Sequence, residues 1–107
     1  MSYGIVLSPE ARHALARIDV PIRQKLLRQL EILGEYPTEL SQPSHWPYRE
    51  KCQMFPLDVD HEGWRWELRT LFQYSQDEQT LQVWMMGFSK LTIEEAERRE
   101  PPLDESH

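Results

Sequence analysis

The sequence predicts a single α+β domain in which a helical hairpin packs on one face of a small, twisted, mostly antiparallel sheet. Three observations predict this class. The chain of 107 residues has the length of one domain with one hydrophobic core. Two segments in its first third carry an apolar stripe with helical spacing, and apolar residues in its second half recur at every second position. The expected order of elements is β-α-α-β-β-β.

A short strand and a helix are expected first. Residues 3–7 alternate in character, with Val6 as the exception, which is typical of a half-buried strand. Ser8, Pro9 and Glu10 then indicate a helix start, because a hydroxyl caps free N–H groups, proline suits the first turn, and a carboxylate favours the positive end of the helix dipole. The apolar stripe of this helix consists of Ala11, Ala14, Leu15 and Ile18.

A second helix is expected from Pro21 to Leu33, with Asp19 as its cap and Gly34 as its end. Its apolar face consists of Ile22, Leu26, Leu27, Leu30 and Leu33. Because so few residues join the two helices, they must lie antiparallel or nearly so, and the stripe on each helix needs a sheet to cover it.

Prolines interrupt the segment between Glu35 and Lys51, which we interpret as a loop. They are Pro37, Pro43 and Pro47. The aromatic residues of this loop are Tyr36, Trp46 and Tyr48. We expect them to pack on the edge of the domain, and an aromatic platform for a ligand is the alternative.

Strands dominate the second half of the chain. A strand over residues 55–60 is followed by a turn at His61, Glu62 and Gly63, where the glycine can take a positive φ. The strand over 64–74 has strict period-two alternation. Its apolar face consists of Trp64, Trp66, Leu68, Phe72 and Tyr74, with Thr70 between them, and its polar face of Arg65, Glu67, Arg69 and Gln73, interrupted by Leu71. After a turn at 75–79, residues 80–88 are apolar on both faces, which predicts a central strand. The helices should cover the Trp-rich face and leave the polar face open.

The net charge of −6 counts against a nucleic-acid binder, because phosphate contacts need clustered lysine and arginine. The charge is concentrated at one end. From Glu94 onward the chain has six acidic and two basic residues, whereas residues 1–93 have twelve acidic and ten basic ones. We interpret the end as a solvated acidic helix or tail; a tail that masks a basic surface is the alternative.

The sequence also predicts a cytoplasmic protein that does not enter a membrane. No apolar run approaches the roughly 20 residues that a bilayer crossing needs, and the start of the chain has no charged region followed by an apolar stretch. The single cysteine, Cys52, cannot form an internal disulfide, which fits a reducing compartment, and we expect it to be a small buried hydrophobe.

The polar face of the strand over 64–74 is the first candidate site. Arg65 and Arg69 could hold a phosphate through paired hydrogen bonds, because alternate residues of a strand stand on the same face. The alternative is that they form surface ion pairs with Asp58 and Asp60 across the hairpin. Asp58, Asp60 and His61 could instead supply oxygen and nitrogen ligands to a metal, although an acidic hairpin tip is ordinary turn chemistry.

Several segments together resemble the RelE/ParE superfamily of bacterial toxins. They are the opening strand, the Ser-Pro-Glu-Ala helix start, the helical hairpin ending in "LGEYP", and "WELRTLFQY" followed by "VWMMGFSKLT". The last two look most like the HigB or phage Gp49 branch, whose members carry an "ELR" strand and a "GFxKK" ending. The resemblance covers residues 3 to about 99. It assigns residues 1–93 to a toxin-like domain and 94–107 to an acidic C-terminal helix or tail.

The resemblance implies the toxin of a type II toxin–antitoxin system, a ribosome-dependent endonuclease that cuts messenger RNA without a cofactor or metal and is neutralised by an antitoxin protein. Arg69 matches the strand arginine of the family and would clamp the scissile phosphate. Lys90 matches the first basic residue of the family's ending and would hold RNA phosphate or donate a proton. Arg65 and His61 are added as catalytic candidates from their expected place beside Arg69.

The chain also departs from the family pattern. Leu91 stands where many relatives have a second lysine, and no tyrosine follows Lys90 to act as a terminal acid. Two alternatives therefore stay open. One is a catalytically degenerate scaffold that binds a protein partner, and the other is a ParE-like inhibitor of gyrase. The sequence does not decide the oligomeric state.

Overall fold

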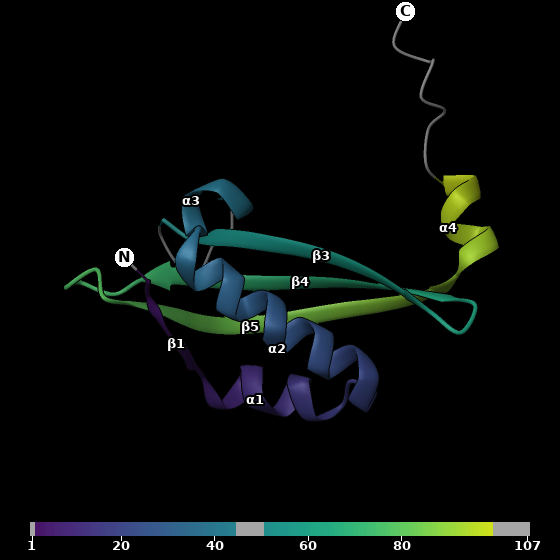
Figure 1. Ribbon diagram of the computed structural model, residues 1–107, viewed down its shortest axis with the longest axis horizontal. Helices are drawn as coiled ribbons and strands as arrows, with labels where there is room; N and C mark the ends of the chain where they lie inside the picture. Colours follow the sequence, from purple (N-terminus) through teal and green to yellow (C-terminus); the bar gives the residue numbers. More distant parts are fainter. Residues whose placement is uncertain (1, 45–50, 100–107) are drawn as a thin grey trace, which may run out of the picture.

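A five-stranded mixed sheet forms the centre of the molecule, and the helices α1 and α2 cross one of its faces (Figure 1). The computed structural model describes residues 2–44 and 51–99. In chain order its elements are β1 (Gly4–Leu7), α1 (Pro9–Ala16), α2 (Val20–Glu35), α3 (Pro37–Leu40), β2 (Gln42–Pro43), β3 (Gln53–His61), β4 (Trp64–Tyr74), β5 (Thr80–Thr92) and α4 (Ile93–Arg99). The α+β class predicted from the sequence is confirmed.

The strands lie in the order β1-β5-β4-β3-β2. β1 runs parallel to β5, and the other neighbouring strands pair antiparallel, so the expected mostly antiparallel sheet is confirmed. β5 lies between β1 and β4, so it is an interior strand, as its apolar residues on both faces indicate, while β4 occupies the centre of the sheet.

The register divides the side chains of the sheet between two faces. Alternate residues of a strand point to opposite faces, and directly paired residues of antiparallel strands point to the same face. Even-numbered residues of β4 from Trp66 to Phe72 are buried against the two long helices, and we call this the helix-side face. The odd-numbered residues Arg65, Glu67 and Arg69 point the other way, to what we call the open face. The core between helices and sheet contains Ala11, Ile18, Ile22, Leu26, Leu30, Leu33, Phe55, Val59, Trp66, Leu68, Phe72, Leu81, Val83 and Met86.

The predicted cap of α1 also ties the helix to the sheet. The hydroxyl of Ser8 accepts a hydrogen bond from the N–H of Ala11 at 3.0 Å and donates one to the carbonyl of Trp84 in β5 at 2.7 Å. Asp19 occupies the corresponding position before α2, but its side chain makes no capping hydrogen bond. Asp19 is therefore the N-cap residue that the sequence predicted, but only its backbone carbonyl takes part, accepting from the N–H of Arg23 at 2.8 Å, and α2 depends on its buried apolar face.

Gly34 does not end α2, which continues to Glu35, so the predicted helix end is wrong. The glycine is required by a close approach of the chain instead. The N–H of Tyr3 donates to the carbonyl of Gly34 at 2.7 Å, and a Cβ added at Gly34 would lie 2.6 Å from the carbonyl oxygen of Tyr3. The absence of a side chain lets the segment before β1 hydrogen-bond to the last turn of α2.

We expect Gly34→Ala to destabilise the protein by about 1 kcal/mol or more. In an ordinary helix interior the same change stabilises by up to about 1 kcal/mol, whereas forced overpacking costs roughly 1–3 kcal/mol. Urea unfolding measures the difference. Gly87→Ala is the control, because a Cβ there meets nothing within 4 Å. A Gly34→Ala variant as stable as the wild type would contradict this account of the contact.

The segment predicted as a loop, residues 35–51, contains regular structure in its described part. Pro37 begins α3, and the hydroxyl of Ser41 donates to the Pro37 carbonyl at 2.6 Å. β2 then pairs with the start of β3. Proline begins the short helix here because the first turn needs no N–H from it. Tyr36 is 53% exposed and so does not pack on the domain edge as expected, while Trp46 and Tyr48 lie outside the described residues.

The last strand is longer than predicted and leads directly into α4. The N–H of Ile93 donates to the carbonyl of Gly63 at 3.0 Å, which fixes the start of α4 beside the β3–β4 turn, and Ala96 is buried. The helical form of the acidic end is present to Arg99, and residues 100–107 lie outside the described part. The division of the chain at residue 93 stays a prediction.

Cys52 is 1% exposed, in agreement with its expected role as a buried hydrophobe. Within residues 2–44 and 51–99, no helix is both long and apolar enough to cross a lipid bilayer.

Candidate functional site

Two arginine–aspartate pairs stand on the open face, and both arginines come from β4. Arg65 donates to Asp60 through Nε at 2.7 Å and through Nη2 at 3.1 Å. Arg69 donates to Asp58 through Nη1 at 3.0 Å and to the carbonyl of Leu68 at 2.8 Å. β3 and β4 form a tight hairpin, which places Asp60 directly opposite Arg65. It places Asp58 opposite Glu67 and therefore diagonal to Arg69 on the same face. The ion-pair alternative considered from the sequence is therefore present in the structure.

The two arginines differ in how much of each guanidinium remains available. The side chain of Arg65 is 15% exposed, and its fork is engaged by both carboxylate oxygens of Asp60. This contact lowers the pKa of Asp60. The side chain of Arg69 is 39% exposed, and none of the described residues accepts a hydrogen bond from its Nε or Nη2. Arg69 can therefore donate to a second anion while it keeps Asp58.

Space is available beside Arg69. Its direct neighbours across the strands are Gly87 in β5 and Pro56 in β3. A Cβ added at Gly87 would meet nothing within 4 Å, so the surface next to the guanidinium is open. An anion can approach Arg69 from the β5 side without displacing a side chain at position 87.

Glu67 separates the two arginines and is held by other partners. The hydroxyl of Ser89 donates to Glu67 Oε1 at 3.0 Å, and Arg99 of α4 donates to Oε2. The hydrogen bond from Arg99, followed by that from Ser89, lowers the pKa of Glu67. This carboxylate therefore connects α4 to the open face.

We expect the contribution of Glu67 to stability to depend on pH. A carboxyl whose pKa is lowered by folding stabilises the folded state above its unfolded pKa of about 4.3, and this stabilisation is lost as the pH falls through the folded pKa. The wild type should exceed Glu67→Gln in free energy of unfolding at pH 7, and the difference should shrink below about pH 4. Urea unfolding at both pH values measures it. Glu62→Gln is the control, because this side chain is 82% exposed and its replacement should have little effect at either pH. If the free energies of unfolding of the wild type and of Glu67→Gln differed by the same amount at both pH values, the prediction would be contradicted.

Two of the four predicted site residues lie on the other face. His61 pairs with Trp64 and Lys90 pairs with Trp66, so both point to the helix-side face. The expectation that His61 lies beside Arg69 is wrong, because Trp64, its partner in β4, is an odd number of positions from Arg69. Lys90 stands on the same helix-side face for the same reason, through its partner Trp66. The ammonium group of Lys90 lies 4.7 Å from the ring centroid of Trp64 and 5.0 Å from that of Trp66. This cation–π contact stabilises Lys90 at the end of the core.

The metal alternative meets the same geometric obstacle. Asp58 and Asp60 point to the open face, whereas His61 points to the helix-side face. No group of three or more metal-ligating side chains converges anywhere in the described ranges. These three residues do not form the ligand set that their spacing suggested.

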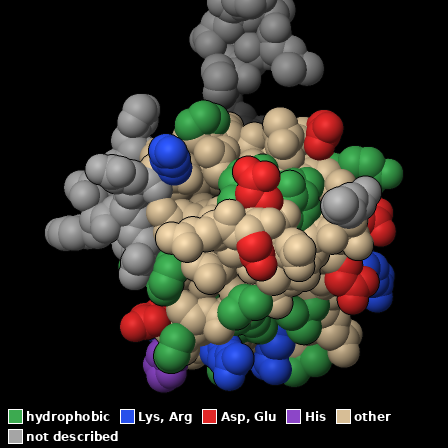
Figure 2. Space-filling view, turned by 90° about the vertical axis from the view of Figure 1, so that its left-hand side faces the viewer, with side chains coloured by type: hydrophobic (Ala, Val, Ile, Leu, Met, Phe, Trp, Pro, Cys, Tyr) green, Lys and Arg blue, Asp and Glu red, His purple; other side chains and the backbone are tan. Residues whose placement is uncertain are grey.

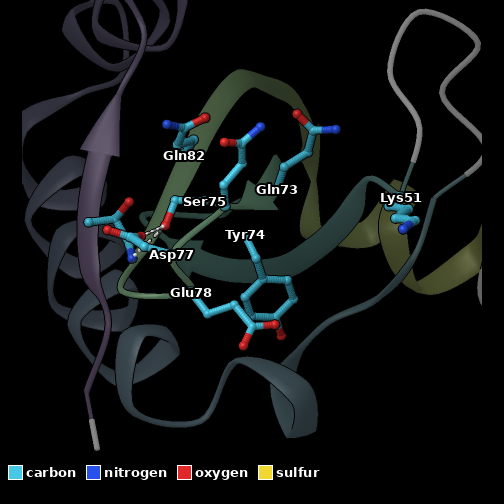
Figure 3. A pocket seen from close by; sticks show the side chains of 9 residues that line it. Lys51, Gln73, Tyr74, Ser75, Asp77, Glu78 and Gln82 are labelled. Atoms are coloured by element: carbon cyan, nitrogen blue, oxygen red, sulfur yellow. Dashed lines mark hydrogen bonds between the residues drawn. The ribbon is translucent and has the colours of Figure 1, made fainter.

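A wide hollow lies at the β4–β5 turn, away from Arg69. It has a volume of about 1060 Å³, and its lining includes Lys51, Tyr74, Asp77 and Glu78 (Figure 3). The hydroxyl of Ser75 donates to Asp77 at 2.5 Å and lowers the pKa of that carboxyl. Acidic side chains are scattered across this end of the molecule (Figure 2). The hollow therefore does not suit a phosphate.

Arg69 and Asp58 together provide a cation and an adjacent carboxylate on an exposed surface. The cation can stabilise a phosphorane, and the carboxylate can accept a proton from a hydroxyl bound beside it. From the sequence, Asp58 is predicted only as an ion-pair partner or a metal ligand. Its place beside Arg69 follows from the pairing of β3 with β4 on the two sides of the Gly63 turn. The hairpin predicted from the sequence already implies this pairing.

Comparison with known proteins gives matches at the level of structure. No protein-family model matches the sequence, and no curated protein matches it. A chain of the RelBE2 toxin–antitoxin complex from Mycobacterium tuberculosis matches with a TM-score of 0.60 and 12% identity over 83% of this chain and 100% of that chain. The isolated E. coli RelE toxin matches with a TM-score of 0.59 and 17% identity over 92% and 98%. The chain has the fold of the RelE toxins.

A third match is an E. coli RelE mutant in complex with a peptide of the antitoxin RelB, with a TM-score of 0.55 and 16% identity over 96% of this chain and 100% of that chain. At these identities the likeness concerns the fold. The RelE fold agrees with the superfamily that the sequence resembles, and the finer resemblance to HigB or Gp49 stays a prediction.

Proposed function

We propose that the protein is the toxin of a type II toxin–antitoxin system and acts on RNA from its open face. The observation that carries this proposal is Arg69, which in a RelE fold presents Nε and Nη2 to the surface beside the open position at Gly87. A planar guanidinium with two available donors matches a phosphate group in charge and geometry. The HigB-like or Gp49-like identity belongs to the same proposal.

The reaction that suits this geometry is attack by a ribose 2′ oxygen on the adjacent phosphorus. Arg69 stabilises the negative charge of the phosphorane, and the carboxylate of Asp58 accepts the proton of the 2′ hydroxyl. The bond from phosphorus to the 5′ oxygen then breaks, and solvent supplies the proton of the leaving oxygen. This scheme requires neither a metal nor a cofactor.

The other predicted residues take different places in this proposal. Arg65 stands on the same face as Arg69, but its fork is already engaged by Asp60. Lys90 and His61 lie across the sheet from Arg69, so they would contact RNA or ribosomal phosphate away from the cleaved bond. The proposed partners are the ribosome and messenger RNA, with an antitoxin as the neutralising protein, in line with the RelB peptide bound to the matched RelE.

Induced expression in a bacterial host tests the proposal. The toxin should arrest growth, and primer extension should find new breaks within translated messages. Co-expression of an antitoxin encoded next to it should restore growth. Arrest with DNA damage signalling and intact messages would instead favour gyrase inhibition.

A degenerate scaffold that binds a protein is the second candidate, because both open-face arginines have carboxylate partners. Harmless expression at high protein levels, together with stable binding of an antitoxin, would favour it.

A further inference from the structure

The edge of β3 that faces away from β4 is only partly covered. β2 pairs with Gln53 and Met54, and no described residue pairs with this edge from Phe55 to His61. An uncovered strand edge presents a row of backbone N–H and C=O groups that can pair with another chain.

A groove runs along this edge beneath α2. It is lined by Lys25, Arg28 and Gln29 from α2 and by residues 57–60 of β3, and its volume is about 410 Å³. The helix α2 forms one wall of this groove and the strand β3 forms the other. The groove therefore combines a strand edge with side chains above it.

The helix wall of the groove is basic. From Val20 to Leu30, α2 carries Arg23, Lys25 and Arg28 and no acidic residue. Lys25 and Arg28 are exposed, and both line the groove. The acidic side chains of the strand wall, Asp58 and Asp60, point to the open face and pair with Arg69 and Arg65. The helix side of the groove thus favours carboxylates.

We propose that this groove binds an extended acidic segment of a partner protein, which adds to the sheet as a further strand along Leu57–Asp60. Backbone hydrogen bonds to the edge give affinity, and alternate side chains of the segment give specificity. Partner residues opposite Leu57 and Val59 point to the helix-side face and reach Lys25 and Arg28. This inference does not depend on toxin activity.

A second copy of this chain fits the groove less well. Pairing of two β3 edges would bring two sets of Lys25 and Arg28 onto one joined face, and like charges at such positions repel. Pro56 has no N–H to donate, so strand addition is confined to the part of β3 that follows it. The carboxylates of an acidic segment can pair with the basic helix wall, and its backbone can hydrogen-bond to the free edge of β3.

Titration of the full chain with synthetic peptides tests the proposal. The probe is a peptide of alternating threonine and glutamate, about ten residues long, and its counterpart has lysine in place of glutamate. NMR should show the largest shifts at the amides of Leu57–Asp60, with affinity about tenfold higher for the glutamate peptide. Absence of binding, or shifts confined to other elements, would overturn the proposal.

A charge reversal in the groove gives the matched test. Arg28→Glu should weaken binding of the glutamate peptide by about tenfold, whereas Arg12→Glu, the same change at an exposed position of α1 outside the groove, should not. Circular dichroism of both variants checks the fold. Equal losses in the two variants would mean that net charge attracts the peptide and would overturn a specific groove. A dimer of the wild type, found by light scattering without peptide and with the amides of Leu57–Asp60 protected from exchange, would identify a second copy as the occupant and overturn the proposal.

Discussion

Replacing Arg69 by alanine is expected to reduce RNA cleavage by about a hundredfold or more while the fold remains intact. A positioned cation that stabilises charge in the transition state typically contributes this much to the rate. The stability cost should be small, because an exposed ion pair such as Arg69–Asp58 contributes at most about 1 kcal/mol. Cleavage of a defined message in a reconstituted translation system measures the rate, and thermal unfolding measures the stability.

Controls on the same assay separate a local role from loss of charge. Arg65→Ala should reduce cleavage less than tenfold, because its fork is engaged by Asp60, and Arg12→Ala on α1 should have no effect. Asp58→Asn should cost a hundredfold or more if the carboxylate takes the 2′ proton. An active Arg69→Ala variant, or equal losses in all three arginine variants, would remove the basis for the proposed site.

The architecture was predictable because it depends on periodicity. Strict alternation along β4 decided which residues enter the core, and the burial of Trp66, Leu68 and Phe72 follows directly from it. Gly34 was misinterpreted because a helix end and a close backbone approach both require glycine, and only the contact with Tyr3 distinguishes them. Pro37 was misinterpreted in a similar way, since proline both interrupts elements and begins helices.

The candidate site was predictable only where one strand determines it. Arg65 and Arg69 share a face because they are separated by an even number of positions in β4. The face of His61 and of Lys90 depends on the register between strands, and the bulge near Phe72 and Val83 shifts that register within β5. Short motifs fix the faces of residues within one strand but not the register between strands. The predicted site therefore combined residues that stand on opposite faces of the sheet.

The largest expected effect on stability belongs to Phe72. Its side chain is completely buried on the helix-side face, opposite Val83 and in edge-to-face contact with Tyr74 at a centroid distance of 6.0 Å. Phe72→Ala removes most of a large side chain from a core that cannot close around the gap, which typically costs about 3–5 kcal/mol. Since small domains have roughly 5–15 kcal/mol in total, much of the stability should be lost.

Met85→Ala is the matched control, because Met85 lies on the neighbouring strand but is 44% exposed and faces away from the helices. Its effect should stay within about 0.5 kcal/mol. Urea unfolding of both variants measures the contrast. The expected contrast follows from the assignment of Phe72 to the helix-side face and Met85 to the open face. The exposure of Arg69 depends on the same assignment. Equal losses in Phe72→Ala and Met85→Ala would mean that both faces are buried, and an anion would then have no access to the open face.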